Sequence, residues 1–512
     1  MTFVSNIYAL FLLILLILYW SGVHLLAKNS AQKYQNFQLW LLLSASIFFY
    51  ASLQWWYIPL LLAITLINFF LARTIEAQSK VGGKQAQNNQ LSNQEWEQLQ
   101  GFWNRRTTHL LWLGISLNVL LLVGFKYIPF ILNSVAAPLN LSFVTQSANW
   151  IRDRLIAPLG LSFFTFECIA YLVDVYRGAP ATRQLLQFTS YKLFFPKLIS
   201  GPITRFHDFT SQPQISFDES IEGLWLIASG AVKKALLADN LAIYVDLCYG
   251  NLERAGSGDL WLATLAYGLQ LYFDFSGYVD IVRGTALLFG FNLPENFDFP
   301  YFTISIADFW RRWHITLGNW LRNYLYFPLG GSRQGLGRTC LNLFIIMLIA
   351  GIWHGAAWGY VIWGALHGIA LVIHRLTESL SKSWQWLASW WQSFFGILLA
   401  WILTQVMVFT SWVLFRLPNL GQATTVFQHY WNYAGDTQFA QKVYAEALGL
   451  QRYHVTLLIA ALISSMSIIY FVQRGLKLQL NWTIKLILVP ICLYCVWILA
   501  PEGGLPYIYF DF

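Results

Sequence analysis

Charged residues are scarce in this sequence. Only 11% of its 512 residues are charged, whereas a soluble globular protein carries about 25%. Hydrophobic residues make up 57% and recur as long apolar runs along the whole chain. Because a membrane span needs about 20 apolar residues, this composition excludes an ordinary soluble fold. The sequence predicts an all-α polytopic membrane protein with about ten to twelve transmembrane helices.

The sequence signatures of soluble enzymes are also missing. There is no GxSxG nucleophile elbow, no Walker loop, no dinucleotide fingerprint and no HExxH zinc motif. The five cysteines all lie in or beside apolar runs, which favours buried thiols over disulfides or zinc ligands. We therefore expect no metal and no permanently bound cofactor. The net charge of +8 does not indicate nucleic-acid binding, because the basic residues gather in a few short loops.

Those basic loops predict how the chain crosses the membrane. Lys and Arg concentrate in loops 28–36 and 73–108, whereas 135–150 carries no charge. By the positive-inside rule the two basic loops face the cytoplasm, so the N-terminus is extracytoplasmic. Basic residues before the last apolar run likewise place the C-terminal tail outside. Residues 1–8 contain no Lys or Arg, and the first run is interpreted as a span and not as a cleaved signal.

Composition divides the chain into three zones of a single integral membrane domain, 1–512. Residues 1–150 and 376–512 consist of plain spans, whereas Pro, Gly and ionisable residues repeatedly interrupt the apolar runs of 151–375. Polar groups at membrane depth are tolerated where they are buried in protein or line a water-filled cavity. The middle zone is therefore predicted to hold the functional site. Within it, FPKLISGPITR (195–205) is too irregular for a simple span and is interpreted as re-entrant.

A histidine lies within the longest apolar run of the middle zone. Run 341–374 would be about 51 Å long as one straight helix, against about 30 Å of hydrocarbon, so it must break. The break is predicted at the three glycines that bracket His354, namely Gly351, Gly355 and Gly359. A buried, neutral imidazole there could act as a general base. The alternative is a structural histidine bonded to a neighbouring carbonyl, and His367 is interpreted in that way.

Segment 307–331 has the periodicity of an amphipathic helix. A capping box at Ser305 would begin it, and Pro328 with the glycines that follow would end it. His314 falls on the apolar side, either as a core histidine or facing a buried polar site. Arginines cluster in and after this segment, at Arg311, Arg312, Arg322, Arg333 and Arg338. They serve either membrane topology and anionic headgroups or the docking of an anionic donor such as coenzyme A or an acidic carrier protein.

Five segments in a fixed order resemble the membrane-bound O-acyltransferase (MBOAT) family. They are PLGLSFFTFECIAYLVDVYRG, FFPKLISGPITR, LYFDFSGYVDIVRGTALLFGFNLPENFDFPY, DFWRRWHITLGNWLRNYLYFPLGG and GIWHGAAWGYVIWGALHG, spanning about 158–368. The bacterial branch that acetylates alginate or transfers D-alanine to teichoic acid is the most similar. The resemblance implies broken helices around a central tunnel, and a bacterial cytoplasmic membrane as the location.

The resemblance also implies site residues and a reaction. His354 and His314 correspond to the family's two histidines and are expected to be catalytic. Candidates for lining the tunnel or binding the donor are Asn319, Trp313, Trp353, Arg311, Arg312 and Arg322. The acyl group, most simply acetyl, would pass from a cytoplasmic thioester (acetyl-CoA or a phosphopantetheine carrier) to an extracytoplasmic hydroxyl. The alternatives are D-alanyl transfer to a teichoic acid-type polymer and a non-catalytic lipid or acyl transporter.

The chain ends in an aromatic sequence, YIYFDF, similar to the signature of this branch. Tyr509 is expected to be a transient acyl acceptor or part of a docking plug, or else an interfacial aromatic anchor. The resemblance further implies an extracytoplasmic acyltransferase- or esterase-like partner protein and a polysaccharide or cell-wall polymer as the final acceptor. Membrane lipids complete the expected surroundings.

Overall fold

Helices make up nearly the whole molecule, as the sequence predicts. The computed structural model describes the backbone of residues 3–26, 31–88, 93–209, 215–501 and 504–508. Over these ranges no strand forms, and an isolated bridge joins Phe297 and Trp313. The chain separates into two compact units: unit 1 is Met1–Ile215 with Ala286–Pro294, and unit 2 is Ser216–Thr285 with Glu295–Phe512.

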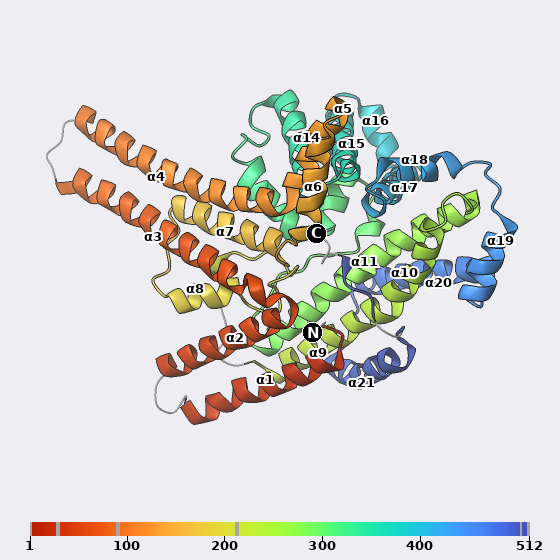
Figure 1. Ribbon diagram of the computed structural model, residues 1–512, viewed down its shortest axis with the longest axis horizontal. Helices are drawn as coiled ribbons and strands as arrows, with labels where there is room; N and C mark the ends of the chain where they lie inside the picture. The colour runs from red at the N-terminus through yellow and green to blue at the C-terminus, as the bar shows by residue number, and fades with distance from the viewer. Residues whose placement is uncertain (1–2, 27–30, 89–92, 210–214, 502–503, 509–512) are drawn as a thin grey trace. The chain divides into compact units, whose positions relative to one another are not determined.

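Unit 1 holds eight α-helices that the structure describes. The two long helices α3 and α4 run side by side, and α7 packs against both (Figure 1). The bounds are α1 (Asn6–Leu26), α2 (Ala31–Gln54), α3 (Ile58–Asn88), α4 (Asn93–Leu122), α5 (Ile128–Leu139), α6 (Ser142–Arg154), α7 (Leu161–Tyr176) and α8 (Leu185–Lys192).

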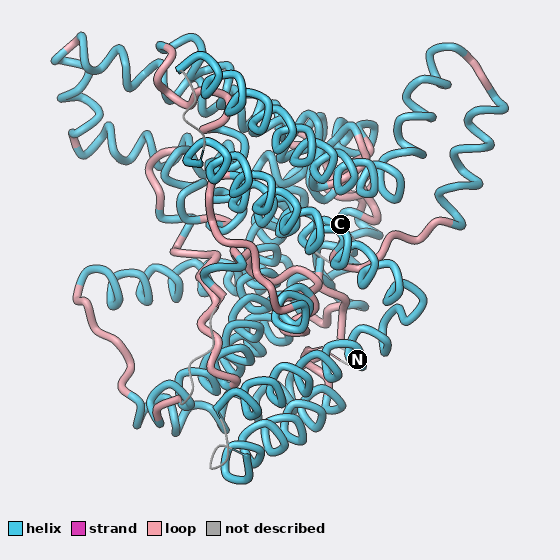
Figure 2. Tube along the Cα trace, turned by 90° about the vertical axis from the view of Figure 1, so that its left-hand side faces the viewer, coloured by secondary structure: helices cyan, strands magenta, loops and turns pink. Residues whose placement is uncertain are grey.

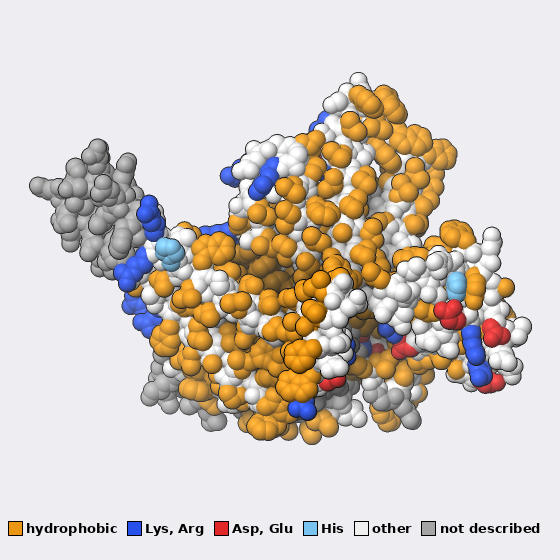
Figure 3. All heavy atoms as spheres, turned by 45° about the horizontal axis from the view of Figure 1, so that its top comes forward, with side chains coloured by type: hydrophobic (Ala, Val, Ile, Leu, Met, Phe, Trp, Pro, Cys, Tyr) orange, Lys and Arg blue, Asp and Glu red, His pale blue; other side chains and the backbone are white. Residues whose placement is uncertain are grey.

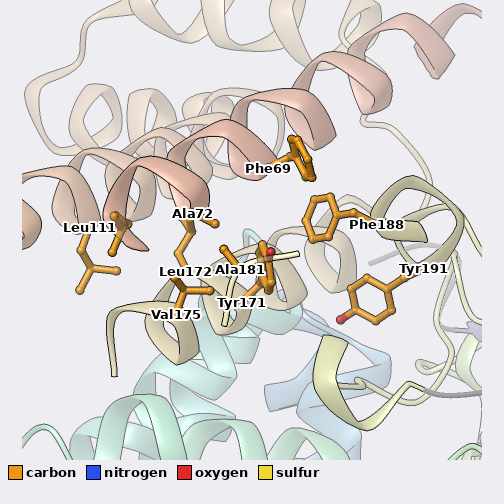
Figure 4. Close-up of a cluster of buried hydrophobic side chains, with 10 residues drawn as sticks. Phe69, Ala72, Leu111, Tyr171, Leu172, Val175, Ala181, Phe188 and Tyr191 are labelled. Carbon is orange, nitrogen blue, oxygen red and sulfur yellow. The ribbon is translucent and has the colours of Figure 1, made fainter. Parts of the chain in front are cut away.

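A cluster of buried apolar side chains joins α3, α4, α7 and α8 (Figure 4). Phe188 of α8 packs against Tyr171 of α7 and Phe69 of α3, with ring centroids 4.6 and 5.9 Å apart. In a membrane protein such contacts contribute through van der Waals packing, because the lipid tails outside are as apolar as these side chains. Almost every residue of α7 is buried, so this helix is the centre of the unit and not a lipid-facing span.

The segment that follows α8 is irregular, as its Pro and Gly content predicts. Residues 194–205 form turns and extended chain around the buried carboxylate of Glu167. Lys192 and Lys197 place their Nζ atoms 3.2 and 2.5 Å from this carboxylate, and Thr204 donates to it through both its backbone amide and its hydroxyl. A buried charge is tolerated only when it is paired and hydrogen-bonded, so Glu167 fixes the path of the segment. Its re-entrant placement in a membrane stays a prediction.

Unit 2 contains the remaining helices. In Figure 2 helices dominate, and both short turns and longer irregular segments join them. The bounds are α9 (Phe217–Ala231), α10 (Asp239–Tyr249), α11 (Ser257–Leu288, whose last turn belongs to unit 1), α12 (Ile306–Arg312), α13 (Ile315–Leu321), α14 (Gly335–His354), α15 (Trp358–Ser383), α16 (Gln385–Gln392), α17 (Phe394–Arg416), α18 (Leu420–His429), α19 (Thr437–Ala440), α20 (Arg452–Tyr470) and α21 (Trp482–Leu499). A π-helical turn follows α9, η4 (Val232–Ala238), and another follows α13, η6 (Arg322–Tyr326).

The apolar run 341–374 is broken at the predicted place. Helix α14 ends at His354 because Gly355 adopts an extended conformation. Helix α15 begins at Trp358, after three intervening residues. The two helices then pack as a close hairpin. A β-carbon at Gly351 would collide with the Tyr360 carbonyl oxygen and lie 2.8 Å from the Cα of Gly364. Glycine at this crossing therefore allows the two backbones to approach.

The prediction of one continuous helix over 307–331 is wrong. Its start is confirmed, since the Ser305 hydroxyl accepts the Asp308 amide at 3.1 Å, but the helix stops at Arg312 and resumes at Ile315. An extended segment from elsewhere in unit 2 takes the intervening backbone bonds. The Asp298 amide donates to the Arg312 carbonyl, and the Ile315 amide donates to the Asn296 carbonyl.

Seven helical segments in the described part of the chain are long and apolar enough to cross a membrane. They are Tyr34–Lys80 (which includes α2 and α3), Asn104–Ala136, Gly335–His354, Trp358–Ser383, Phe394–Arg416, Arg452–Gly475 and Trp482–Leu499. Hydrophobic side chains cover most of the face visible in Figure 3. The polytopic all-α class is confirmed. The total of ten to twelve spans, the three zones and the central tunnel stay predictions.

Candidate active site

His354 is the last residue of α14, and its ring is buried among aromatic side chains. Ring centroids of Trp353, Trp363 and Phe415 lie 4.8, 5.2 and 5.0 Å away. Only 2% of the residue is exposed, so the imidazole faces the interior of unit 2 and not the surrounding lipid. The helix end and the hairpin turn that follows hold it there.

His314 occupies the break between α12 and α13. Its backbone is in the left-handed region, with φ at +45°, a conformation that non-glycine residues rarely adopt and that often marks a functional site. The ring is buried against Phe275 of α11, with centroids 4.8 Å apart. Burial lowers the pKa of His314 to about 3, so the imidazole is neutral at physiological pH.

Trp353 brings the two histidines into one neighbourhood. Its ring centroid lies 4.8 Å from that of His354 and 6.2 Å from that of His314. Residues 40 positions apart in the sequence thus contact the same indole. The arrangement combines two buried imidazoles with aromatic walls that exclude water, a setting in which a neutral histidine can accept a proton from a bound hydroxyl.

Asn296 adds a polar group that sequence patterns did not single out. Its Oδ1 accepts the backbone amide of Thr316 at 2.9 Å and the Thr316 hydroxyl at 2.7 Å. A backbone amide can only donate, so the oxygen is fixed on that side and Nδ2 points the other way. In the described structure Nδ2 is buried and has no hydrogen-bond partner. Such orphaned donors cost about 1–3 kcal/mol and are rare, which marks the neighbourhood of His314 as a place where a ligand atom can bind.

Comparison with known proteins shows the family to which a chain with this site belongs. A family model described as MBOAT, membrane-bound O-acyltransferase family, matches residues 8–413. The chain belongs to this family. It is therefore a membrane acyltransferase, as the resemblance implied, and the alternative of a non-catalytic transporter falls away.

Curated relatives of this acyltransferase carry related names. The "Probable alginate O-acetylase AlgI" of Pseudomonas putida is 39% identical over 459 residues, covering 88% of this chain and 84% of the relative. The "Peptidoglycan O-acetyltransferase" of Helicobacter pylori is 36% identical over 424 residues, covering 76% and 73%. The "Teichoic acid D-alanyltransferase" of Bacillus subtilis is 27% identical over 250 residues, covering 46% and 63%.

A third buried histidine of this MBOAT protein, His367, has structural bonds to both ring nitrogens. The Trp310 indole donates to Nδ1 at 3.3 Å, so Nδ1 carries no proton, and Nε2 faces the Ser411 hydroxyl at 2.9 Å. That hydroxyl donates to the Val408 carbonyl, so Nε2–H must be the donor to it. Both nitrogens are occupied in a single tautomer. The structure thus agrees with a structural role for His367, and it provides a natural control for His354.

The other predicted site residues separate into buried and exposed groups. Trp313 and Trp353 are buried within unit 2, whereas Asn319 is exposed and accepts a hydrogen bond from Arg322 at 3.0 Å. Arg312 is half-buried and pairs with Asp308 at 3.1 Å. The exposed arginines of the acyltransferase are Arg311, Arg322, Arg333 and Arg338. Tyr509 lies outside the described residues.

Metal ligation finds no support in the described part of this acyltransferase. No group of three or more His, Cys, Asp or Glu side chains there is placed to hold an ion. The five cysteines are free thiols.

Proposed function

We propose that this MBOAT protein transfers an acetyl group from a cytoplasmic thioester to a hydroxyl, for modification of an extracytoplasmic polysaccharide or cell-wall polymer. The observation that carries the proposal is the pair of buried histidines, His354 and His314, whose rings both lie near the Trp353 indole. The names of the relatives at 36–39% identity supply the acetyl group and the polymer acceptor. D-alanyl transfer to a teichoic acid-type polymer is the second candidate, because the relative of that name matches over 46% of the chain.

His354 acts as the general base in the proposed reaction. Its neutral imidazole takes the proton from the acceptor hydroxyl, and the oxygen attacks the thioester carbonyl. The tetrahedral intermediate then collapses, the C–S bond breaks, and the proton from His354 passes to the leaving thiolate. His314, whose ring also lies near Trp353, orients the thioester. General-base catalysis of this kind contributes about 10²–10⁴-fold.

Asn296 stabilises the oxyanion in this scheme. Its Nδ2 group is the buried donor without a protein partner, and it is fixed in orientation by the two bonds from Thr316 to Oδ1. A preorganised donor directed at the developing oxyanion is worth about 10²–10³-fold in rate. Substituting Asn296→Asp keeps an acceptor for Thr316 and removes the donor, so the rate of transfer should fall by that factor. Thr316→Val removes one bond to Oδ1 but leaves Nδ2 in place, and should cost less than about tenfold.

The exposed arginines Arg311, Arg322, Arg333 and Arg338 form the proposed donor-docking surface. An Arg guanidinium pairs bidentately with phosphate, which suits coenzyme A or the phosphopantetheine of a carrier protein. By the positive-inside rule this basic face is cytoplasmic. The protein would then lie in the bacterial cytoplasmic membrane with its N-terminus and its C-terminal tail outside.

Delivery to the polymer is proposed to use the tail and a partner. Tyr509 would accept the acyl group as an ester, or would act as a plug, and an extracytoplasmic acyltransferase- or esterase-like protein would move the group to the polymer hydroxyl. The tail is suited to this role because a tyrosine hydroxyl can carry an acyl ester.

The deciding experiment uses the purified protein in lipid nanodiscs. With radiolabelled acetyl-CoA, the wild-type protein should consume thioester and acetylate an added acceptor, whereas His354→Gln should not. Consumption of a D-alanyl carrier protein with no use of acetyl-CoA would favour the second candidate. An equal rate of thioester consumption in wild type and His354→Gln would refute the assignment of the base.

A further inference from the structure

A buried cluster of one lysine and two aspartates lies in unit 2, apart from the two histidines in sequence. Lys234 places its Nζ 2.8 Å from the carboxylate of Asp239 and 2.6 Å from that of Asp274. All three side chains are almost fully buried. They come from three consecutive elements, since Lys234 lies in the π-helical turn η4, Asp239 begins α10, and Asp274 lies in the middle of α11.

Segment 504–508 is bound directly to this cluster. Lys234 Nζ donates to the Pro506 carbonyl at 3.3 Å, and the backbone amide of Ile508 donates to Asp274 Oδ2 at 3.0 Å. Between these two bonds the Tyr507 ring is buried, with its centroid 4.7 Å from Lys234 Nζ and 4.8 Å from the ring of Tyr278. Gly504 to Pro506 are exposed, so the segment is held at one buried aromatic residue and the backbone on either side of it.

The chemistry of these contacts is that of a site for an extended peptide. One lysine facing two carboxylates leaves an excess of negative charge in a buried position, which is costly unless further donors compensate it. The Ile508 amide supplies such a donor, while the Pro506 carbonyl uses a remaining proton of Lys234. The backbone of segment 504–508 provides both hydrogen bonds, and the Tyr507 ring lies near the Lys234 ammonium group. Cluster and segment therefore satisfy each other's polar groups.

We propose that Lys234 and Asp274, supported by Asp239, are positioning residues that dock segment 504–508, and that this dock is needed for delivery of the acyl group through the tail. The consequence for catalysis rests on the proposed function, in which Tyr509 takes part in delivery. The docking itself rests only on the contacts of residues 504–508. Release of the segment should uncouple the two halves of the reaction. Water can then replace the tail hydroxyl as the nucleophile at the histidines, so thioester is still consumed by hydrolysis, whereas delivery through the tail is lost.

The chain contains a matched control one residue away. Lys233, the neighbour of Lys234, pairs with Asp280 of α11 at 2.6 Å, so the same two elements carry a second lysine–aspartate pair. That pair is partly exposed, and in the described structure it makes no hydrogen bond to segment 504–508. Asp280→Asn therefore removes the same charge from the same helix without touching the dock.

Hydrogen–deuterium exchange on the full-length protein in nanodiscs tests the dock directly. In wild type the peptide containing residues 504–508 should be protected, because the Ile508 amide donates to Asp274. Asp274→Asn and Lys234→Met should speed its exchange by about tenfold or more, and Asp280→Asn should leave it unchanged. Lys234→Arg, which keeps the charge, should restore most of the protection. Unchanged exchange in both Asp274→Asn and Lys234→Met, or equal acceleration in Asp280→Asn, would overturn the proposal.

Two further measurements keep the result independent of folding and of the proposed function. Tyr507→Ala leaves every charge of the cluster paired, so it should fold, and it should accelerate the same exchange. The ratio of acceptor acetylated to thioester consumed should fall by about tenfold in Asp274→Asn and stay within about twofold of wild type in Asp280→Asn. If Tyr509→Phe transfers at the wild-type rate, the delivery role of Tyr509 fails while the exchange result still decides the dock.

Discussion

Replacing His354 with glutamine should abolish acyl transfer while leaving the protein folded. The substitution preserves a polar side chain of similar reach, but an amide cannot take a proton from a hydroxyl near neutral pH. The rate per folded molecule should therefore fall by about 10²–10⁴-fold, the contribution of a general base. This loss corresponds to about 3–5 kcal/mol of activation free energy.

The contacts of the ring limit the cost to stability. The imidazole packs against Trp353, Trp363 and Phe415 at centroid distances of 4.8–5.2 Å. An aromatic pair contributes about 0.5–1.5 kcal/mol beyond its buried area, and glutamine recovers part of the apolar contact. We expect the free energy of unfolding to fall by about 1–3 kcal/mol. That change alters the amount of folded protein and not the rate of each folded molecule.

His367→Gln is the matched control. Both histidines are buried and both pack against Trp363, but His367 is bonded through both nitrogens to Trp310 and Ser411. Its replacement should lower stability by a similar amount, about 1–3 kcal/mol, because the Trp310 indole loses or weakens its acceptor. The rate per folded molecule should remain within about threefold of wild type.

The assay measures thioester consumption and acceptor acetylation in nanodiscs, normalised to the folded fraction from size-exclusion chromatography and thermal unfolding. A loss of rate in His354→Gln with a nearly unchanged rate in His367→Gln supports a chemical role for His354 and not for His367. If both variants lose rate equally for the same loss of stability, the effect at His354 is one of packing. The general-base assignment is then refuted.

Three other perturbations have defined outcomes. The double variant Arg311→Gln/Arg322→Gln should raise the KM for acetyl-CoA about tenfold with little change in kcat and should flatten the salt dependence of KM; an unchanged KM would move the donor site elsewhere. Gly351→Ala should destabilise the α14–α15 hairpin by about 1–3 kcal/mol, measured as a lower unfolding temperature, because the new β-carbon meets the backbone of Gly364 at 2.8 Å. As the pH falls from about 6.5 to about 5, the free energy of unfolding should fall by about 2 kcal/mol through His314. Its pKa is about 3 in the folded state, so over this range only the unfolded chain gains the proton. In a urea-unfolding series, His314→Gln should remove this dependence on pH.

Local patterns were sufficient where a feature depended on its immediate neighbours. The break after His354 follows from glycines within a few residues and from the length of the apolar run, and the structure places it there. The cap at Ser305 likewise depends on one residue three positions ahead. The irregular path of 194–205 could also be predicted, because its prolines and glycine remove helical hydrogen bonds from the segment itself.

Features that depend on distant backbone were missed. Periodicity favoured a continuous helix through His314, since nothing in 307–331 shows that residues 296–298 take its hydrogen bonds. No sequence pattern singled out Asn296, and its orphaned amide becomes visible only when Thr316 is placed beside it. One carboxylate partner of Lys234, Asp274, lies 40 residues away on another helix, and the contact of Lys234 with Pro506 involves the far end of the chain.

The sequence by itself determined the class of the molecule. Apolar runs of about 20 residues or more with little charge cross a bilayer as helices, which satisfy their own backbone hydrogen bonds. Its motifs also predicted, through their resemblance to the family, that His354 and His314 are the catalytic histidines. Only the tertiary structure decided that Trp353 touches both, that His314 sits at a helix break, and that a buried charge cluster binds segment 504–508. The physical reason is range: hydrophobic period and glycine act over one or two helical turns, whereas side-chain contacts and buried ion pairs join residues whose separation along the chain carries no signal.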